Sequence, residues 1–283
     1  MYGSGWMDDV CEKPKKTQPD LWRMVRTFSP LAGKFVDRLT ELDAILPNGK
    51  ELRMIRDQLE KLQSGEPITI TSVICPDYLV SNEGGTLRYT FQGLGDGIGL
   101  VTRRAMDVHV RLKQFFAREG VSGVRSELIM ASQEATEENC QRMKTDQAEF
   151  IARLKRSQLA LADEARKLGV EVSTPLLTEM DSDSWNRAKS DAEVFIRDIT
   201  NGQINSVRIS RLGLIQQWAG RLLSSDEITK MIIAQGTEYI AVGKFLAHPG
   251  RLILGLDSPV MEVFLRRGTR DVTPVVYFRR PSY

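Results

Sequence analysis

Short apolar runs rich in β-branched residues alternate along this sequence with longer stretches whose apolar spacing is that of amphipathic helices. The runs that we interpret as strands are Pro67–Tyr78, Thr86–Gln92, Arg125–Ser132, Val170–Leu177, Arg251–Leu256 and Thr273–Phe278. Strands that alternate with helical segments of about ten residues or more are typical of βαβ units. The alternation therefore predicts a Rossmann-like α/β fold, a mainly parallel sheet of about five or six strands with helices on both faces.

Two details of this sheet follow from the connections. After the turn at Ser81–Gly85, the run Thr86–Gln92 is close enough to the first strand to form a hairpin with it. The final strand, Thr273–Phe278, follows a short connection, so we expect it to run antiparallel at an edge. Helices are expected at about 99–120, 137–168, 184–200, 206–223, 226–246 and 258–266.

The chain divides into three parts by pattern. Residues 1–19 are polar and aperiodic, which predicts a flexible tail. Residues 20–64 carry apolar side chains spaced by three or four, with a break at Ser29-Pro30, which predicts an N-terminal helical extension. Residues 65–283 would then form the Rossmann-like domain.

Composition excludes several classes of protein. With 41% hydrophobic and 27% charged residues, the chain has the composition of a folded globular protein. No apolar segment approaches about 18 residues, so we expect no membrane partner. A formal net charge of +2 predicts no strong long-range attraction to nucleic acid.

Cysteine and histidine usage points to a reducing compartment. Cys11, Cys75 and Cys140 are far apart, and the only histidines are His109 and His248. This pattern favours neither a disulfide framework nor a zinc site, so we expect no metal site of that kind and a cytoplasmic location. Neither histidine has a recognisable Ser or Cys partner in the sequence, which argues against nucleophilic catalysis.

Acidic residues follow several predicted strands. Ligands of open parallel sheets bind outside the carboxyl ends of the strands. Asp77 follows the apolar run of the first strand, and Glu134 and Asp257 follow the ends of two others; their carboxylates would bind ribose hydroxyls or Mg²⁺ with a phosphate. A purely structural alternative exists for each, because Asp257-Ser258-Pro259, for example, also has the form of a helix start.

A glycine-rich segment precedes the helix expected at 99–120. Gly93, Gly95, Gly97 and Gly99 alternate with other residues, including Asp96, and backbone N–H groups there can approach an anion. The spacing matches neither G-x-G-x-x-G nor a P-loop. A strand, a glycine-rich turn with an acid and then a helix broadly resembles the cofactor loop of Rossmann-like methyltransferases, which implies S-adenosylmethionine. The alternative is a tight turn without a ligand.

Two further groups are candidates for substrate binding. Arg103 and Arg104 lie in the first turn after the glycines, where cations oppose the helix dipole, so a bound anion would explain them. Gln235 and Tyr239 fall on the inward face of the helix expected at 226–246, with Glu238 flanking them, and buried polar groups need partners. The alternative is that Tyr239 packs in the core with its hydroxyl at the rim and that Gln235 caps a backbone group. We interpret Gln235 as substrate-binding and Glu238, Tyr239 and Asp77 as catalytic.

Three functions are compatible with these features. The first is a group-transfer enzyme for a small-molecule substrate, with S-adenosylmethionine or ATP and Mg²⁺ as donor. The second is an enzyme that uses aminoacyl-tRNA, with an architecture similar to that of cyclodipeptide synthases; the basic segment 142–156 would bind tRNA, but that family's catalytic serine motif finds no match here. The third is a non-catalytic binding protein, in which the basic helices are simply solvated faces.

Overall fold

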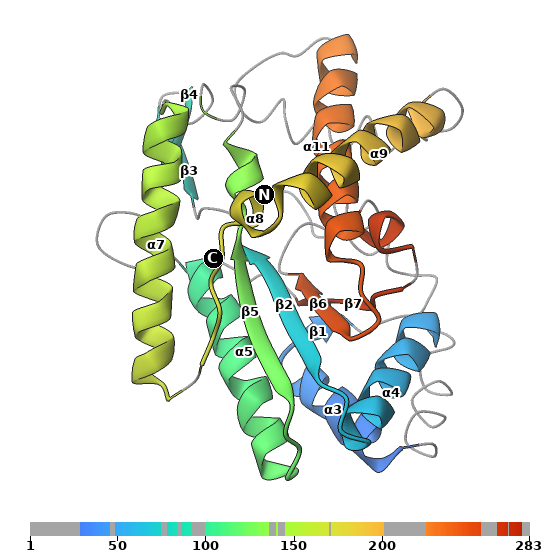
Figure 1. The fold of residues 1–283 in the computed structure, drawn as a ribbon. Helices are drawn as coiled ribbons and strands as arrows, with labels where there is room; N and C mark the ends of the chain where they lie inside the picture. The colour runs from blue at the N-terminus through green and yellow to red at the C-terminus, as the bar shows by residue number, and fades with distance from the viewer. Residues whose placement is uncertain are drawn as a thin grey trace.

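The computed structural model describes residues 29–45, 49–74, 78–83, 86–91, 100–135, 140, 145–169, 171–200, 225–255, 265–270 and 272–278. They form a five-stranded sheet flanked by helices (Figure 1), which confirms the predicted Rossmann-like α/β class. The helix predicted at 206–223 lies outside these residues. Within the described ranges, no helix is both long enough and apolar enough to cross a membrane.

The sheet has the strand order β1-β7-β6-β2-β5. Its members are β1 (Ala44–Ile45), β2 (Ile68–Ile74), β5 (Val124–Met130), β6 (Arg251–Gly255) and β7 (Val275–Phe278). Strands β5, β2, β6 and β7 pair in parallel, whereas β1 pairs antiparallel with β7. The central strand β2 has the sequence ITITSVI, and five of its seven residues are buried, including the polar Thr71 and Ser72.

An extended segment lies beyond β5. Ser173 and Leu176 form parallel bridges with Glu127 and Met130, in place of the full strand predicted at 170–177. Taken in chain order, the parallel elements β2, β5, the 173–176 segment, β6 and β7 are arranged 3-2-1-4-5. This order is that of a doubly wound Rossmann sheet.

Two predicted details of the sheet are wrong. The last strand, β7, runs parallel and lies inside the sheet, because the connection 256–274 exceeds the dozen or so residues that a parallel crossover needs. The antiparallel edge strand is β1 instead. The predicted first strand also stops at Ile74, and the hairpin forms between β3 (Tyr78–Glu83) and β4 (Thr86–Phe91); Pro76 has no N–H to continue a ladder.

Alternate residues of the strands face two separate cores. Ile70 and Leu128 belong to the first core, and Ile129 and Ile253 belong to the second. The first is covered by α3 (Pro30–Glu41), α4 (Gly49–Gln63), α5 (Leu100–Arg118) and α7 (Gln147–Lys167). The second is covered by α8 (Leu177–Met180), α9 (Ser182–Thr200) and α11 (Ser225–Leu246). Helices therefore cover both faces of the sheet, as predicted.

The N-terminal helices have the expected end signals. Helix α3 begins at Pro30, and the Ser29 hydroxyl accepts a hydrogen bond from the Ala32 N–H at 3.3 Å, so the Ser29-Pro30 break is a helix cap. In α4, the Gln58 amide donates to the carbonyls of Pro249 and Arg251 at 2.9 and 2.8 Å. This contact places α4 at the amino end of β6.

Candidate functional site

The topology singles out one position on the sheet. From β2 the chain passes to β5 on one side, and it later returns through α11 to β6 on the other side. The carboxyl ends of β2 and β6 therefore lie side by side at the point where the winding reverses. Doubly wound sheets bind their ligands at this point.

Two of the predicted acids follow these two strands. Strand β2 ends at Ile74, three positions before Asp77, and β6 ends at Gly255, two positions before Asp257. The register pairs Ser72 with Leu254, so both strands end at nearly the same level. Asp77 and Asp257 themselves lie outside the described residues, as do Gly93, Gly95, Asp96, Gly97 and Gly99.

Next to β2, the end of β5 is fixed by Ser132. The Ser132 hydroxyl lies 2.8 Å from the Thr178 hydroxyl and accepts the Thr178 N–H at 3.0 Å. The Ala131 N–H donates to the Ile74 carbonyl at 2.8 Å. Glu134 ends the following short 3-10 helix, Ser132–Glu134, but its side chain lies outside the described residues. The carboxyl edge is thus a hydrogen-bonded junction of β2, β5 and α8.

Helix α11 carries the predicted polar group Gln235, Glu238 and Tyr239, and it packs on the second core. Tyr239 is half-buried and packs against that core. Glu238 is also half-buried. Gln235 lies one turn earlier in α11, with a side chain outside the described residues. Among the described side chains of this predicted group, Tyr239 is therefore the one that packs against the second core.

The two adjacent arginines of α5, Arg103 and Arg104, lie in different surroundings. Arg104 donates to the Leu42 carbonyl at 2.8 Å and lies 3.3 Å from the Asp107 carboxylate, so it ties α5 to the turn after α3. Arg103 is exposed and lines a cavity on the flank of α5. Arg104 is therefore held by groups of the protein itself, whereas Arg103 is exposed at the cavity.

A buried Ser–His pair was missed by the sequence argument. The His109 Nε2 atom lies 2.9 Å from the Ser72 hydroxyl oxygen, and both side chains are buried between α5 and β2. Burial lowers the pKa of His109 to about 3, and nearby Lys113 adds to the shift. The expectation that His109 lacks a Ser partner was therefore wrong. The signal for it was a histidine one residue from the α5 apolar stripe and a serine inside an apolar strand. With no solvent access, the pair cannot act as a nucleophile.

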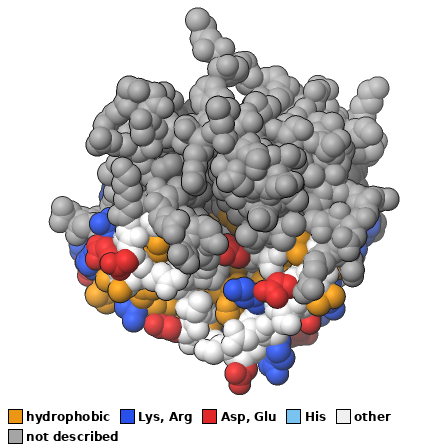
Figure 2. Space-filling view, turned by 90° about the horizontal axis from the view of Figure 1, so that it is seen from above, with side chains coloured by type: hydrophobic (Ala, Val, Ile, Leu, Met, Phe, Trp, Pro, Cys, Tyr) orange, Lys and Arg blue, Asp and Glu red, His pale blue; other side chains and the backbone are white. Residues whose placement is uncertain are grey.

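Most described basic residues on the helices are neutralised by acids. Arg111 pairs with Asp107, Lys155 pairs with Glu179, and Arg153 and Arg156 both contact Glu149. These cations pair with acids of their own surface, as on an ordinary solvated face. In Figure 2, Lys and Arg side chains are likewise interspersed with Asp and Glu side chains over the described surface. Arg142 and Lys144 lie outside the described residues.

Among the described residues, no three His, Cys, Asp or Glu side chains form a group that could hold a metal ion.

Comparison with known proteins adds little to this picture. No protein-family model matches the sequence, and no curated protein matches it. Among solved structures, the chain is similar to a cyclodipeptide synthase from Bacillus thermoamylovorans, with a TM-score of 0.44 and 8% sequence identity. The match covers 80% of this chain and 94% of that chain.

Proposed function

We propose that this chain is a group-transfer enzyme that binds a nucleotide-like donor where the carboxyl ends of β2 and β6 meet. The observation that carries the proposal is the 3-2-1-4-5 order of the parallel elements, with the reversal of winding between these two strands. A doubly wound sheet leaves a crevice at this position, since successive connections depart to opposite sides.

The residues that follow the two strands supply the chemistry that a nucleotide needs. Asp77 and Asp257 would bind ribose hydroxyls or a Mg²⁺ ion with its phosphates. The glycines 93–99 directly precede α5, so their N–H groups would meet the anionic part of the donor near a helix N-terminus.

The acceptor would lie on the α11 side. There the Glu238 carboxylate would take the acceptor's proton while the acceptor's electron pair forms the new bond and the donor's bond to the transferred group breaks. Tyr239, which packs against the second core, would position the acceptor. The donor is either S-adenosylmethionine or ATP with Mg²⁺.

Thermal unfolding with a panel of ligands tests the proposal. The panel contains S-adenosylmethionine, ATP with and without Mg²⁺, and bulk tRNA, and native mass spectrometry detects a co-purified donor. The variants are Asp77→Asn and Asp257→Asn, and the control is Asp57→Asn, an exposed residue of α4 at the opposite end of the sheet.

We expect one donor to raise the melting temperature of the wild type and of Asp57→Asn, and to have less effect on the other two variants. Stabilisation by tRNA alone would contradict a small donor and favour the aminoacyl-tRNA alternative. No stabilisation by any member of the panel would contradict the group-transfer proposal as a whole.

A further inference from the structure

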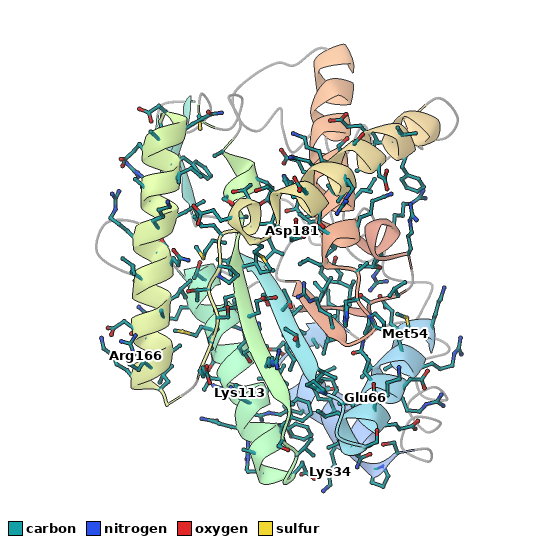
Figure 3. All side chains as sticks on the ribbon, viewed as in Figure 1. Lys34, Met54, Glu66, Lys113, Arg166 and Asp181 are labelled. Atoms are coloured by element: carbon teal, nitrogen blue, oxygen red, sulfur yellow. The ribbon has the colours of Figure 1, made fainter. Side chains whose placement is uncertain are left out.

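A cavity of about 440 Å³ runs along the flank of α5. Helix α5 lies between α3 and α7 in Figure 1, and residues of all three helices line the cavity. Lys113 of α5 donates to the Glu171 carbonyl at 3.1 Å, which ties α5 to the segment that follows α7; Figure 3 labels Lys113 and, at the end of α7, Arg166. The volume is within the usual range of small-molecule sites, about 300–1,000 Å³.

Three arginines line this α5 groove: Arg38, Arg103 and Arg111. Arg111 is held by Asp107 at 2.9 Å. Arg103 is exposed and makes no ion pair or hydrogen bond with any residue that the structure describes. The groove therefore contains a cation that protein groups leave unmatched.

Arg38 adds a second unmatched donor. Its Nη1 atom contacts the Glu41 carboxylate at 2.6 Å, while its Nε atom is buried and has no hydrogen-bond partner in the described part of the chain. A guanidinium group binds carboxylates and phosphates through pairs of parallel N–H donors. Arg38 lines the groove and its side chain is 18% exposed, so its exposed N–H groups, and not the buried Nε, would meet an oxyanion.

Apart from Gln114, the rest of the lining is apolar or acidic. Met106 and Val110 are buried beside the groove, and Leu168, just after α7, is half exposed. Of the two lining acids, Asp107 is neutralised by Arg104 and Arg111, whereas Glu164 makes no ion pair with a described residue. The carboxylate of Glu164 would repel a ligand with several negative charges.

We propose that the α5 groove binds an organic oxyanion, with a single carboxylate or phosphate head group at Arg38 and Arg103 and a short apolar chain against Met106, Val110 and Leu168. The lining comes from α3, α5 and the end of α7, and it includes none of Asp77, Asp257, Glu238 and Tyr239, which the group-transfer proposal uses. Its failure would leave the group-transfer proposal untouched.

Calorimetric titration of the full chain tests the site with three probes: hexanoate, hexyl phosphate and inorganic phosphate. Arg103→Gln is the main variant because Arg103 is exposed and its loss should not disturb folding. Arg53→Gln, an exposed arginine of α4 outside the groove, removes the same charge elsewhere and is the matched control.

We expect saturable binding of hexanoate, hexyl phosphate or both, weakened about tenfold in Arg103→Gln and unchanged in Arg53→Gln. Glu164→Gln should strengthen binding, and Leu168→Ser should weaken it. Tighter binding of hexanoate would identify the head group as a carboxylate, and tighter binding of hexyl phosphate would identify it as a phosphate. Absence of saturable binding, equal losses in the two arginine variants, or inorganic phosphate binding as tightly as hexyl phosphate would each overturn the proposal.

Discussion

His109 of α5 and Ser72 of β2 form a hydrogen-bonded pair in the first core, with 2.9 Å between Nε2 and the hydroxyl oxygen. Neither side chain reaches solvent, and the His109 Nδ1 atom has no partner among the described residues. A neutral imidazole forms its hydrogen bond with the Ser72 hydroxyl through Nε2. An imidazolium in this position would be an uncompensated buried charge.

Stability should therefore fall in acid because of His109. The pKa of His109 is about 3 in the folded chain and about 6.5 when unfolded, so between these values only the unfolded state takes up the proton. The contribution of His109 is complete above pH 6.5 and is lost as the pH falls toward 3, by at most about 1.4 kcal/mol per pH unit. Urea unfolding at several pH values should show a shallower dependence in His109→Gln than in the wild type. The exposed His248→Gln is the control, and equal slopes in all three proteins would contradict this account.

A substitution at Gly243 should test the close approach of α11 to residues 265–269. A Cβ atom at Gly243 would lie 2.4 Å from the Leu265 carbonyl oxygen, and one at Gly268 would lie 2.2 Å from the Ile240 carbonyl oxygen. Alanine normally stabilises a helix interior relative to glycine by roughly 0.5–1 kcal/mol. Here we expect Gly243→Ala to destabilise the chain by about 1–3 kcal/mol instead. Chemical denaturation measures the sign, and a more stable variant would show that the backbones are not in contact.

The junction at the carboxyl edge should depend on Ser132. Ser132→Ala removes the acceptor of the Thr178 N–H and the partner of the Thr178 hydroxyl, so we expect a loss of about 1–2 kcal/mol. Thr178→Val removes only the second of these bonds and should cost less. Thermal unfolding of the two variants gives the order, and the reverse order would place the main restraint elsewhere.

Glu127 and Arg251 should be energetically coupled across β2. The Arg251 Nη2 atom lies 3.3 Å from Glu127 Oε2, which also accepts a hydrogen bond from the Thr71 hydroxyl at 3.1 Å. Both charged side chains are largely buried, so removing one leaves the other poorly solvated. A double-mutant cycle with Arg251→Met and Glu127→Gln should give a coupling energy of about 1 kcal/mol. Additive effects would mean that solvent screens the pair.

The sequence predicted the structure best in segments where the apolar residues repeat with a single spacing, that of a strand or that of a helix. The apolar runs at β2, β5 and β6 and the helical stripe of α5 are local patterns, and they were enough to predict the class of the fold. The orientation of β7 was not predictable in this way, because it depends on the path of the whole 256–274 connection.

Long-range pairs also lay outside the reach of local patterns. Ser72 and His109 are 37 positions apart, and only the packing of α5 on β2 joins them. Arg103 and Arg104 carried one shared prediction, yet successive residues of a helix point about 100° apart, since a turn has 3.6 residues. One therefore faces the groove while the other ties α5 to Leu42.

The two-residue strand β1 is the outer neighbour of β7, a strand whose four side chains are all buried. A ladder this short opens easily, and each opening would uncover the N–H and C=O groups of an apolar edge, Val275–Phe278. Partly denaturing conditions should therefore produce self-association of the chain before its helices melt, and β1 serves as a guard against aggregation as much as a part of the sheet.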